Sequence, residues 1–191
     1  ITANDYPGYQ FENWVGDNNQ TDRSRAKTLS LDENQTIIAE FKKRSPSKGD
    51  INPYATVEKI SIGYMQSGAS ALSVLTDSHF FGGKNADLTE ARKFNFCPIL
   101  RKDFVIDEYQ LLEAKSIGAD AILLIAECLE KDELKQLAKT AKNLGLEVLM
   151  EIHSIGQLAK LNENIDIVGV NNRNLENFTV DINNSIGLST A

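Results

Sequence analysis

The sequence predicts an α/β fold with a parallel sheet of the (β/α)8 barrel type, of which about six strand–helix units are present. From residue 36 onward, short apolar runs alternate six times with amphipathic segments. Each run is about five residues long and is bounded by Gly, Asp, Asn or Pro, as is typical of buried parallel strands. No Gly-rich phosphate loop follows the first run, and polar residues follow several different runs. A closed barrel is therefore favoured over an open doubly wound sheet.

The individual elements follow from this alternation. The predicted strands are residues 36–41, 71–75, 98–100 with their flanks, 121–125, 147–152 and 165–170. The predicted helices are residues 55–66, 86–94, 107–116, 130–144 and 154–161. Apolar residues at helical spacing are clearest in the segment 130–144. Gly68, Gly118 and Gly145 follow predicted helices and indicate where those helices end.

The chain divides into two parts by composition. Residues 1–35 are polar and have no helical or strand period, so we expect an irregular N-terminal segment to which no role is assigned. Residues 36–191 are expected to form the barrel domain, units one to six, with a sixth helix at 183–189. Strands seven and eight of a complete barrel are expected to be missing.

Charge and composition exclude several classes of protein. Acidic residues outnumber basic ones by 27 to 20, and the net charge of −7 argues against a surface for nucleic acid or anionic membranes. No run approaches the roughly 20 apolar residues of a membrane span, and the N-terminus has no secretory signal pattern. Cys97 and Cys128 have no metal or disulfide spacing, and His79 and His153 are isolated, so both histidines are expected to be structural or on the surface. We expect a cytoplasmic globular protein.

Charged residues at strand ends form the candidate site. Glu40 and Lys42 are two residues apart in a strand and share a face. In a barrel this face is the lumen, where an ion pair is costly unless it is used, whereas an exposed pair on the outer surface is the alternative. Lys102 ends the third strand, and its neighbours Arg101 and Asp103 share the opposite face and are placed to pair with each other.

Glu151 stands inside an apolar run and is the candidate base. A carboxylate withdrawn from water is suited to accept a proton near neutral pH, whereas a position at a wet rim is the alternative. At the end of the next strand, Asn171 and Arg173 share the face of Gly169.

These strand ends would meet at one mouth of a barrel. That mouth would gather three cations around two carboxylates: Lys42, Lys102, Arg173, Glu40 and Glu151. Such a cluster in a net-acidic protein predicts an anionic small molecule as the substrate. Spacing alone indicates a barrel enzyme of this kind and goes no further.

Seven linked blocks of sequence resemble the indole-3-glycerol-phosphate synthases in order and spacing. They are IAEFKKRSPSKG (38–49), LSVLTD with FFGG (72–83), LRKDF (100–104), EYQ (108–110), GADA (118–121), EVLME (147–151) and NNRNL (171–175). The resemblance implies a TIM-barrel enzyme of tryptophan biosynthesis. Members of the family close the indole ring of 1-(2-carboxyphenylamino)-1-deoxyribulose 5-phosphate, a substrate with a carboxylate and a phosphate, and release carbon dioxide and water without a metal or cofactor.

The resemblance also implies roles for individual residues. Lys102 resembles the general acid that protonates the substrate carbonyl, and Glu151 resembles the general base of the dehydration. Lys42 resembles a residue that binds the anionic groups and assists catalysis. Glu40 and Asn171 resemble catalytic groups that orient these side chains. The substrate-binding residues implied are Arg173 and Ser45, with an apolar pocket for the aromatic ring formed by Pro46, Phe81, Phe104, Leu123 and Ile125.

Two other interpretations stay open at this point. Strands seven and eight supply much of the phosphate site in the family, so the chain is alternatively a catalytically incomplete barrel fragment. Another phosphate-binding barrel, such as phosphoribosylanthranilate isomerase, is the second alternative. That activity favours a Cys/Asp pair at strand ends, for which Cys97 and Cys128 are not well placed. The sequence leaves the oligomeric state open.

Overall fold

The structure is a computed structural model that describes residues 56–172 and, before them, the backbone of five short strands. The side chains of Ala39 and Glu40 are described as well. The chain forms two compact units. Unit 1 comprises Ile1–Asp103 with Ile117–Ala119, and unit 2 comprises Phe104–Ser116 with Asp120–Ala191.

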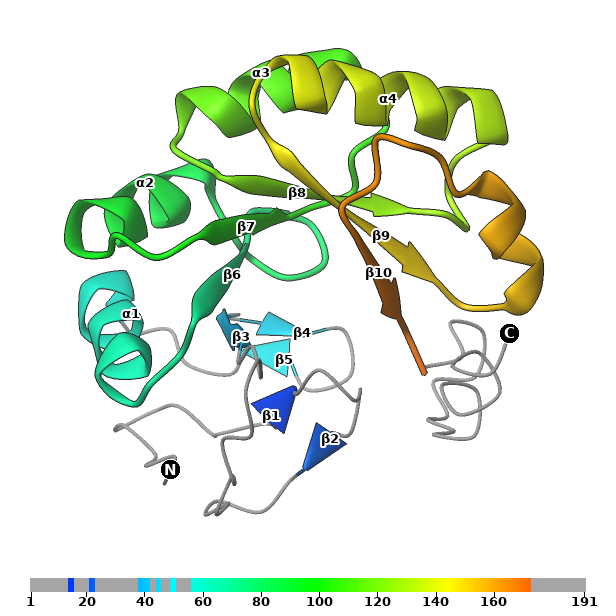
Figure 1. Ribbon diagram of the computed structural model, residues 1–191. Coiled ribbons are helices and arrows are strands. Elements are labelled where there is room, and N and C mark those ends of the chain that lie inside the picture. Colours follow the sequence, from blue (N-terminus) through cyan, green and yellow to red (C-terminus); the bar gives the residue numbers. More distant parts are fainter. Residues whose placement is uncertain are drawn as a thin grey trace. The chain divides into compact units, whose positions relative to one another are not determined.

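Unit 1 contains three parallel strands with β6 (Ala71–Leu75) in the middle (Figure 1). Its neighbours are β3 (Ile38–Phe41) and β7 (Ile99–Lys102), and the helices α1 (Val57–Gln66) and α2 (Asn85–Phe94) follow β3 and β6 along the chain. The register places Glu40 of β3 and Leu100 of β7 on either side of Ser73. Two antiparallel pairs of short strands complete the described elements: β1 (Trp14–Val15) with β2 (Thr21–Asp22), and β4 (Arg44–Ser45) with β5 (Gly49–Asp50).

Unit 2 repeats the same arrangement, with β9 (Glu147–Ile152) as its middle strand. Parallel to it run β8 (Ala121–Ile125) and β10 (Ile167–Val170). The helices are α3 (Glu108–Ser116), α4 (Lys131–Asn143) and the 3-10 helix η1 (Ile155–Lys160). The core of the unit lies between β8, β9 and α4, where the buried residues are Ile122, Leu124, Leu134, Ala138, Val148 and Met150.

The predicted α/β fold of parallel strands is confirmed, with six parallel strands in the described chain, three in each unit. The strands 71–75, 121–125 and 147–152 have the predicted bounds, because each is an apolar run with clear breaks on both sides. The segment predicted as a helix at 154–161 is a tighter 3-10 helix. Two short strands, β1 and β2, lie in the segment expected to be irregular. The helix predicted at 183–189 lies outside the described residues.

The turns after the helices occur where the glycines predict them. Gly118 and Gly145 have φ values of 95° and 69°, a backbone conformation that residues other than glycine rarely adopt. A capping box closes the N-terminus of α4. The Glu130 side chain accepts the backbone N–H of Glu133, and the Glu133 side chain accepts the backbone N–H of Glu130. No helix among the described residues is both long and apolar enough to cross a membrane.

Candidate active site

Lys102 and Glu40 form an ion pair in unit 1. Lys102 Nζ lies 2.7 Å from Glu40 Oε2, and the two side chains are 32% and 35% exposed. Lys102 ends β7 and Glu40 lies near the end of β3, so both are at carboxyl ends of parallel strands. An ammonium fixed in this way, with part of its surface open, is positioned to bind an anion or to donate a proton.

Ser73 of β6 lies between the strands that carry this pair. Residues opposite each other in a parallel register point to the same face of the sheet, so Ser73 shares the face of Glu40. The Ser73 hydroxyl is buried and has no hydrogen-bond partner among the residues that the structure describes. Lys102 is opposite Leu75, so its side chain reaches back along the middle strand to meet Glu40, which is opposite Ser73.

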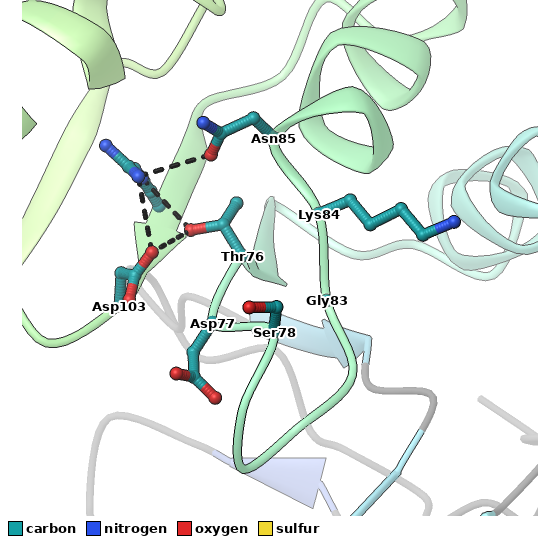
Figure 2. Close-up of a pocket in the computed structure, with 8 residues that line it drawn as sticks. Thr76, Asp77, Ser78, Gly83, Lys84, Asn85 and Asp103 are labelled. Atoms are coloured by element: carbon teal, nitrogen blue, oxygen red, sulfur yellow. Dashed lines mark hydrogen bonds and ion pairs between the residues drawn. The ribbon is translucent and has the colours of Figure 1, made fainter.

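Arg101 anchors a polar network on the other face of the strand end. Figure 2 labels its three partners, Thr76, Asn85 and Asp103. Its Nε donates to Thr76 Oγ1 at 3.0 Å, and its Nη2 donates to Asp103 Oδ2 at 3.3 Å and to Asn85 Oδ1 at 3.2 Å. The Thr76 hydroxyl donates to Asp103 Oδ2 at 2.5 Å. Arg101 is 3% exposed, so these partners, rather than water, stabilise its buried guanidinium. The predicted pairing of Arg101 with Asp103 is confirmed.

The network borders a pocket of about 350 Å³ beneath the loop between β6 and α2. The residues that line it are Thr76, Asp77, Ser78, Gly83, Lys84, Asn85, Arg101 and Asp103. In Figure 2 the Lys84 side chain extends away from Thr76 and Asp103, so its ammonium is not directed at the network.

Asp77 holds this loop in shape. Its carboxylate accepts the backbone N–H groups of Phe80 at 2.6 Å and Phe81 at 3.0 Å, and its carbonyl accepts that of Gly83 at 2.7 Å. A Cβ on Gly83 would collide with the carbonyl of Leu75, so the close turn requires glycine there. The half-buried Phe81, a predicted contact of the aromatic ring, is carried by this loop.

Glu151 and Asn171 form a second polar pair, in unit 2. Asn171 Nδ2 donates to Glu151 Oε1 at 3.1 Å, and Glu151 is 18% exposed. The register partner of Glu151 on β10 is Gly169, which has no side chain to separate Asn171 from the carboxylate. The His153 ring lies near the same carboxylate oxygen, with Nε2 3.8 Å from Oε1. The Glu151 carboxylate is thus largely withdrawn from water and oriented by an amide donor.

The Cys128 thiol and the Glu127 carboxylate lie near Glu151. Burial raises the pKa of the Cys128 thiol, and the carboxylates of Glu127 and Glu151 raise it further. Gln157 joins this region to η1, because its Nε2 donates to Glu127 and its Oε1 accepts the backbone N–H of His153. The carboxyl ends of β8 and β9 are thereby tied to each other by side chains.

The remaining predicted residues fall into two groups. Leu123 and Ile125 lie on β8, where Leu123 is buried and Ile125 half-buried, and Phe104 is 38% exposed. The side chains of the other predicted site residues lie outside the described residues: Lys42, Ser45, Pro46 and Arg173. Within residues 39–40 and 56–172, no three Asp, Glu, His or Cys side chains gather into a group that could hold a metal.

Sequence reasoning did not identify two polar groups beside these pairs. Ser73 was not identified because a serine inside an apolar run gives no indication of which charged side chains lie next to it. His153 was expected to be structural or on the surface, but its distance of two residues from Glu151 already placed both side chains on one face.

The description of the matching family model decides the family of the chain. The model for indole-3-glycerol phosphate synthase matches residues 6–191. The chain belongs to the indole-3-glycerol phosphate synthase family. The blocks that carry Glu40, Lys102, Glu151 and Asn171 all lie within the match.

Relatives in the synthase family are about half identical to this chain. The indole-3-glycerol phosphate synthase of Bacteroides thetaiotaomicron is 51% identical over 172 residues, which cover 90% of this chain and 66% of that protein. The synthase of Campylobacter jejuni subsp. jejuni is 50% identical over 147 residues, which cover 76% of this chain and 57% of that protein. The chain thus spans less than two thirds of the length of each of these relatives.

One matching solved structure shares only slight similarity with this chain. The crystal structure of methylornithine synthase has a TM-score of 0.49 and 17% sequence identity, over 60% of this chain and 42% of that one. A likeness of this size bears on neither fold nor function.

Proposed function

We propose that this protein acts as an indole-3-glycerol-phosphate synthase. Its substrate would be 1-(2-carboxyphenylamino)-1-deoxyribulose 5-phosphate, an anion with a carboxylate and a phosphate, and its products indole-3-glycerol phosphate, carbon dioxide and water. The observation that carries the proposal is the ion pair of Lys102 with Glu40 at the strand ends of a chain in the synthase family. The hydrogen bond from Asn171 to Glu151 supports it from the other unit.

Lys102 is proposed as the general acid of ring closure. When the aryl carbon attacks the substrate carbonyl, negative charge develops on the carbonyl oxygen, and a positioned ammonium lowers the free energy of that transition state. Lys102 has the partial exposure that contact with substrate requires, and Glu40 fixes the direction of its ammonium. Proton donation of this kind commonly contributes a rate factor of about 10²–10⁴.

Glu151 is proposed as the general base of the dehydration. Its carboxylate is 18% exposed, and the Asn171 amide leaves its other oxygen available to take a proton. Roles for Lys42, Ser45, Pro46 and Arg173 in binding the substrate, and for Phe81, Phe104, Leu123 and Ile125 in holding its ring, stay predictions. The cytoplasmic location stays a prediction as well.

A turnover assay tests the proposal. The chain is incubated with the carboxyphenylamino substrate, and product is followed by indole fluorescence. We expect product from the wild type and a loss of kcat of at least about 10²-fold in Glu151→Gln. Glu147→Gln is the matched control, because Glu147 is an exposed carboxylate on the same strand. Absence of product from the wild-type chain, or equal kcat in the wild type and Glu151→Gln, would overturn the proposal.

A further inference from the structure

The His153 ring has polar atoms that nothing in the described part of the chain satisfies. Both ring nitrogens, Nδ1 and Nε2, are buried and have no hydrogen-bond partner among the described residues. A neutral imidazole always has one N–H donor and one acceptor, and a buried donor or acceptor without a partner costs about 1–3 kcal/mol. A ring in this situation gains free energy from any acceptor that it can reach.

The Glu151 carboxylate is an acceptor close to this ring. His153 directly follows β9, two residues after Glu151, and its Nε2 lies 3.8 Å from Glu151 Oε1. An N–H···O bond needs about 2.7–3.2 Å, so a shift of less than about 1 Å closes the gap. Oε1 already accepts Asn171 Nδ2, but a carboxylate oxygen has two lone pairs and can take both donors.

The backbone at His153 is fixed without any help from the ring. Its N–H donates to Gln157 Oε1 at 2.7 Å, and Gln157 in turn donates to Glu127. Lys160 of η1 donates to the carbonyls of Ala126 at 2.8 Å and Leu129 at 2.7 Å. These bonds hold the end of β9 to η1 and to the loop after β8. None of them uses the nitrogens of the His153 ring.

We propose that His153 is a positioning residue for Glu151. Its ring N–H donates to Glu151 Oε1 and, together with Asn171 Nδ2, holds the carboxylate in a single orientation. The hydrogen bond itself does not depend on the enzyme's reaction, whereas its effect on catalysis rests on the proposed function. The two parts are therefore tested separately.

The hydrogen bond is tested by NMR on protein labelled with 15N-histidine. The chain has two histidines, and His79 is exposed, so its ring N–H exchanges rapidly with water. We expect one slowly exchanging ring N–H signal from His153 that is lost in Glu151→Ala and kept in Glu147→Ala. No such signal in the wild type, or a signal that persists in Glu151→Ala, overturns the proposal even if the enzyme is active.

The effect on catalysis is tested with two substitutions at His153. Glutamine keeps a side-chain N–H donor, whereas phenylalanine keeps the bulk of the ring and has none. We expect kcat to fall about tenfold in His153→Phe with KM changed less than about twofold, and to recover largely in His153→Gln. Equal kcat in the two variants would mean that the ring only fills space. If the wild type shows no turnover, the synthase function fails, and the NMR result still decides on the pair.

Discussion

Lys102 Nζ lies 2.7 Å from Glu40 Oε2, although the two residues stand on strands that are separated by β6. On that face the middle strand presents Ser73 opposite Glu40 and Leu75 opposite Lys102, so the Lys102 side chain reaches diagonally across β6. Ser73 is the small residue directly beside Glu40, so a larger side chain at this position would add bulk next to the pair.

Substitutions at Ser73 test how the free energy of unfolding depends on the size and polarity of this residue. Ser73→Ala removes a buried hydroxyl that has no described partner, so we expect the free energy of unfolding in urea to stay the same or rise by up to about 1 kcal/mol. Ser73→Leu forces extra volume under the pair and should lower it by about 1–3 kcal/mol. A marked loss of stability in Ser73→Ala would show that the hydroxyl has an important partner.

Asp103 is expected to be essential for stability because it neutralises the buried Arg101. We expect Asp103→Ala to lower the free energy of unfolding by about 2–4 kcal/mol, since an arginine with 3% exposure loses its carboxylate. The control is Glu90→Ala, whose ion pair with Lys93 is 38% and 61% exposed and should contribute less than about 1 kcal/mol. Similar losses in the two variants would contradict the role of the network.

Asp166 makes the stability of unit 2 dependent on pH. A hydrogen bond from Lys142 holds the pKa of Asp166 below its usual value, and the backbone N–H of Val148 lowers it further. A lowered folded-state pKa stabilises the protein above the unfolded-state pKa of about 3.9, and this stabilisation is lost as pH falls through the folded-state value. We expect Asp166→Asn to lower the urea midpoint at pH 7, and its difference from the wild type to shrink as pH falls below about 3.9.

Alkylation of Cys128 reports on the charges around Glu151. Because burial and the nearby carboxylates raise the thiol pKa, little thiolate is present at pH 8. Glu127→Gln removes one anion, lowers the thiol pKa and should speed alkylation by iodoacetamide about two- to fivefold. Cys128→Ser assigns the signal against Cys97. An unchanged or slower rate in Glu127→Gln would contradict the electrostatic arrangement.

Sequence patterns predicted the parallel α/β fold well because its strands are apolar runs with sharp ends. The strand 147–152 also placed Glu151 on the face that it shares with Leu149, since alternation within a strand is fixed by backbone geometry. The short β4–β5 pair was missed, because Arg44–Ser45 and Gly49–Asp50 show no apolar alternation.

Contacts between strands were harder to predict than positions along one strand. The period of two predicted that Arg101 and Asp103 would pair, but not that Thr76 and Asn85 would complete the network. The partner of Lys102 depends on the register of β3, β6 and β7, and a single sequence does not specify it. The contact of Asn171 with Glu151 likewise depends on the register of β9 and β10.

The kinetic effect of Lys102→Met tests the central claim most directly. The variant keeps much of the side-chain volume and removes the ammonium, and Lys131→Met, at an exposed position on α4, is the control. The proposed role predicts that kcat for the carboxyphenylamino substrate falls by at least about 10²-fold in Lys102→Met, while Lys131→Met keeps the wild-type value. A kcat in Lys102→Met within about twofold of the wild type would contradict Lys102 as the general acid.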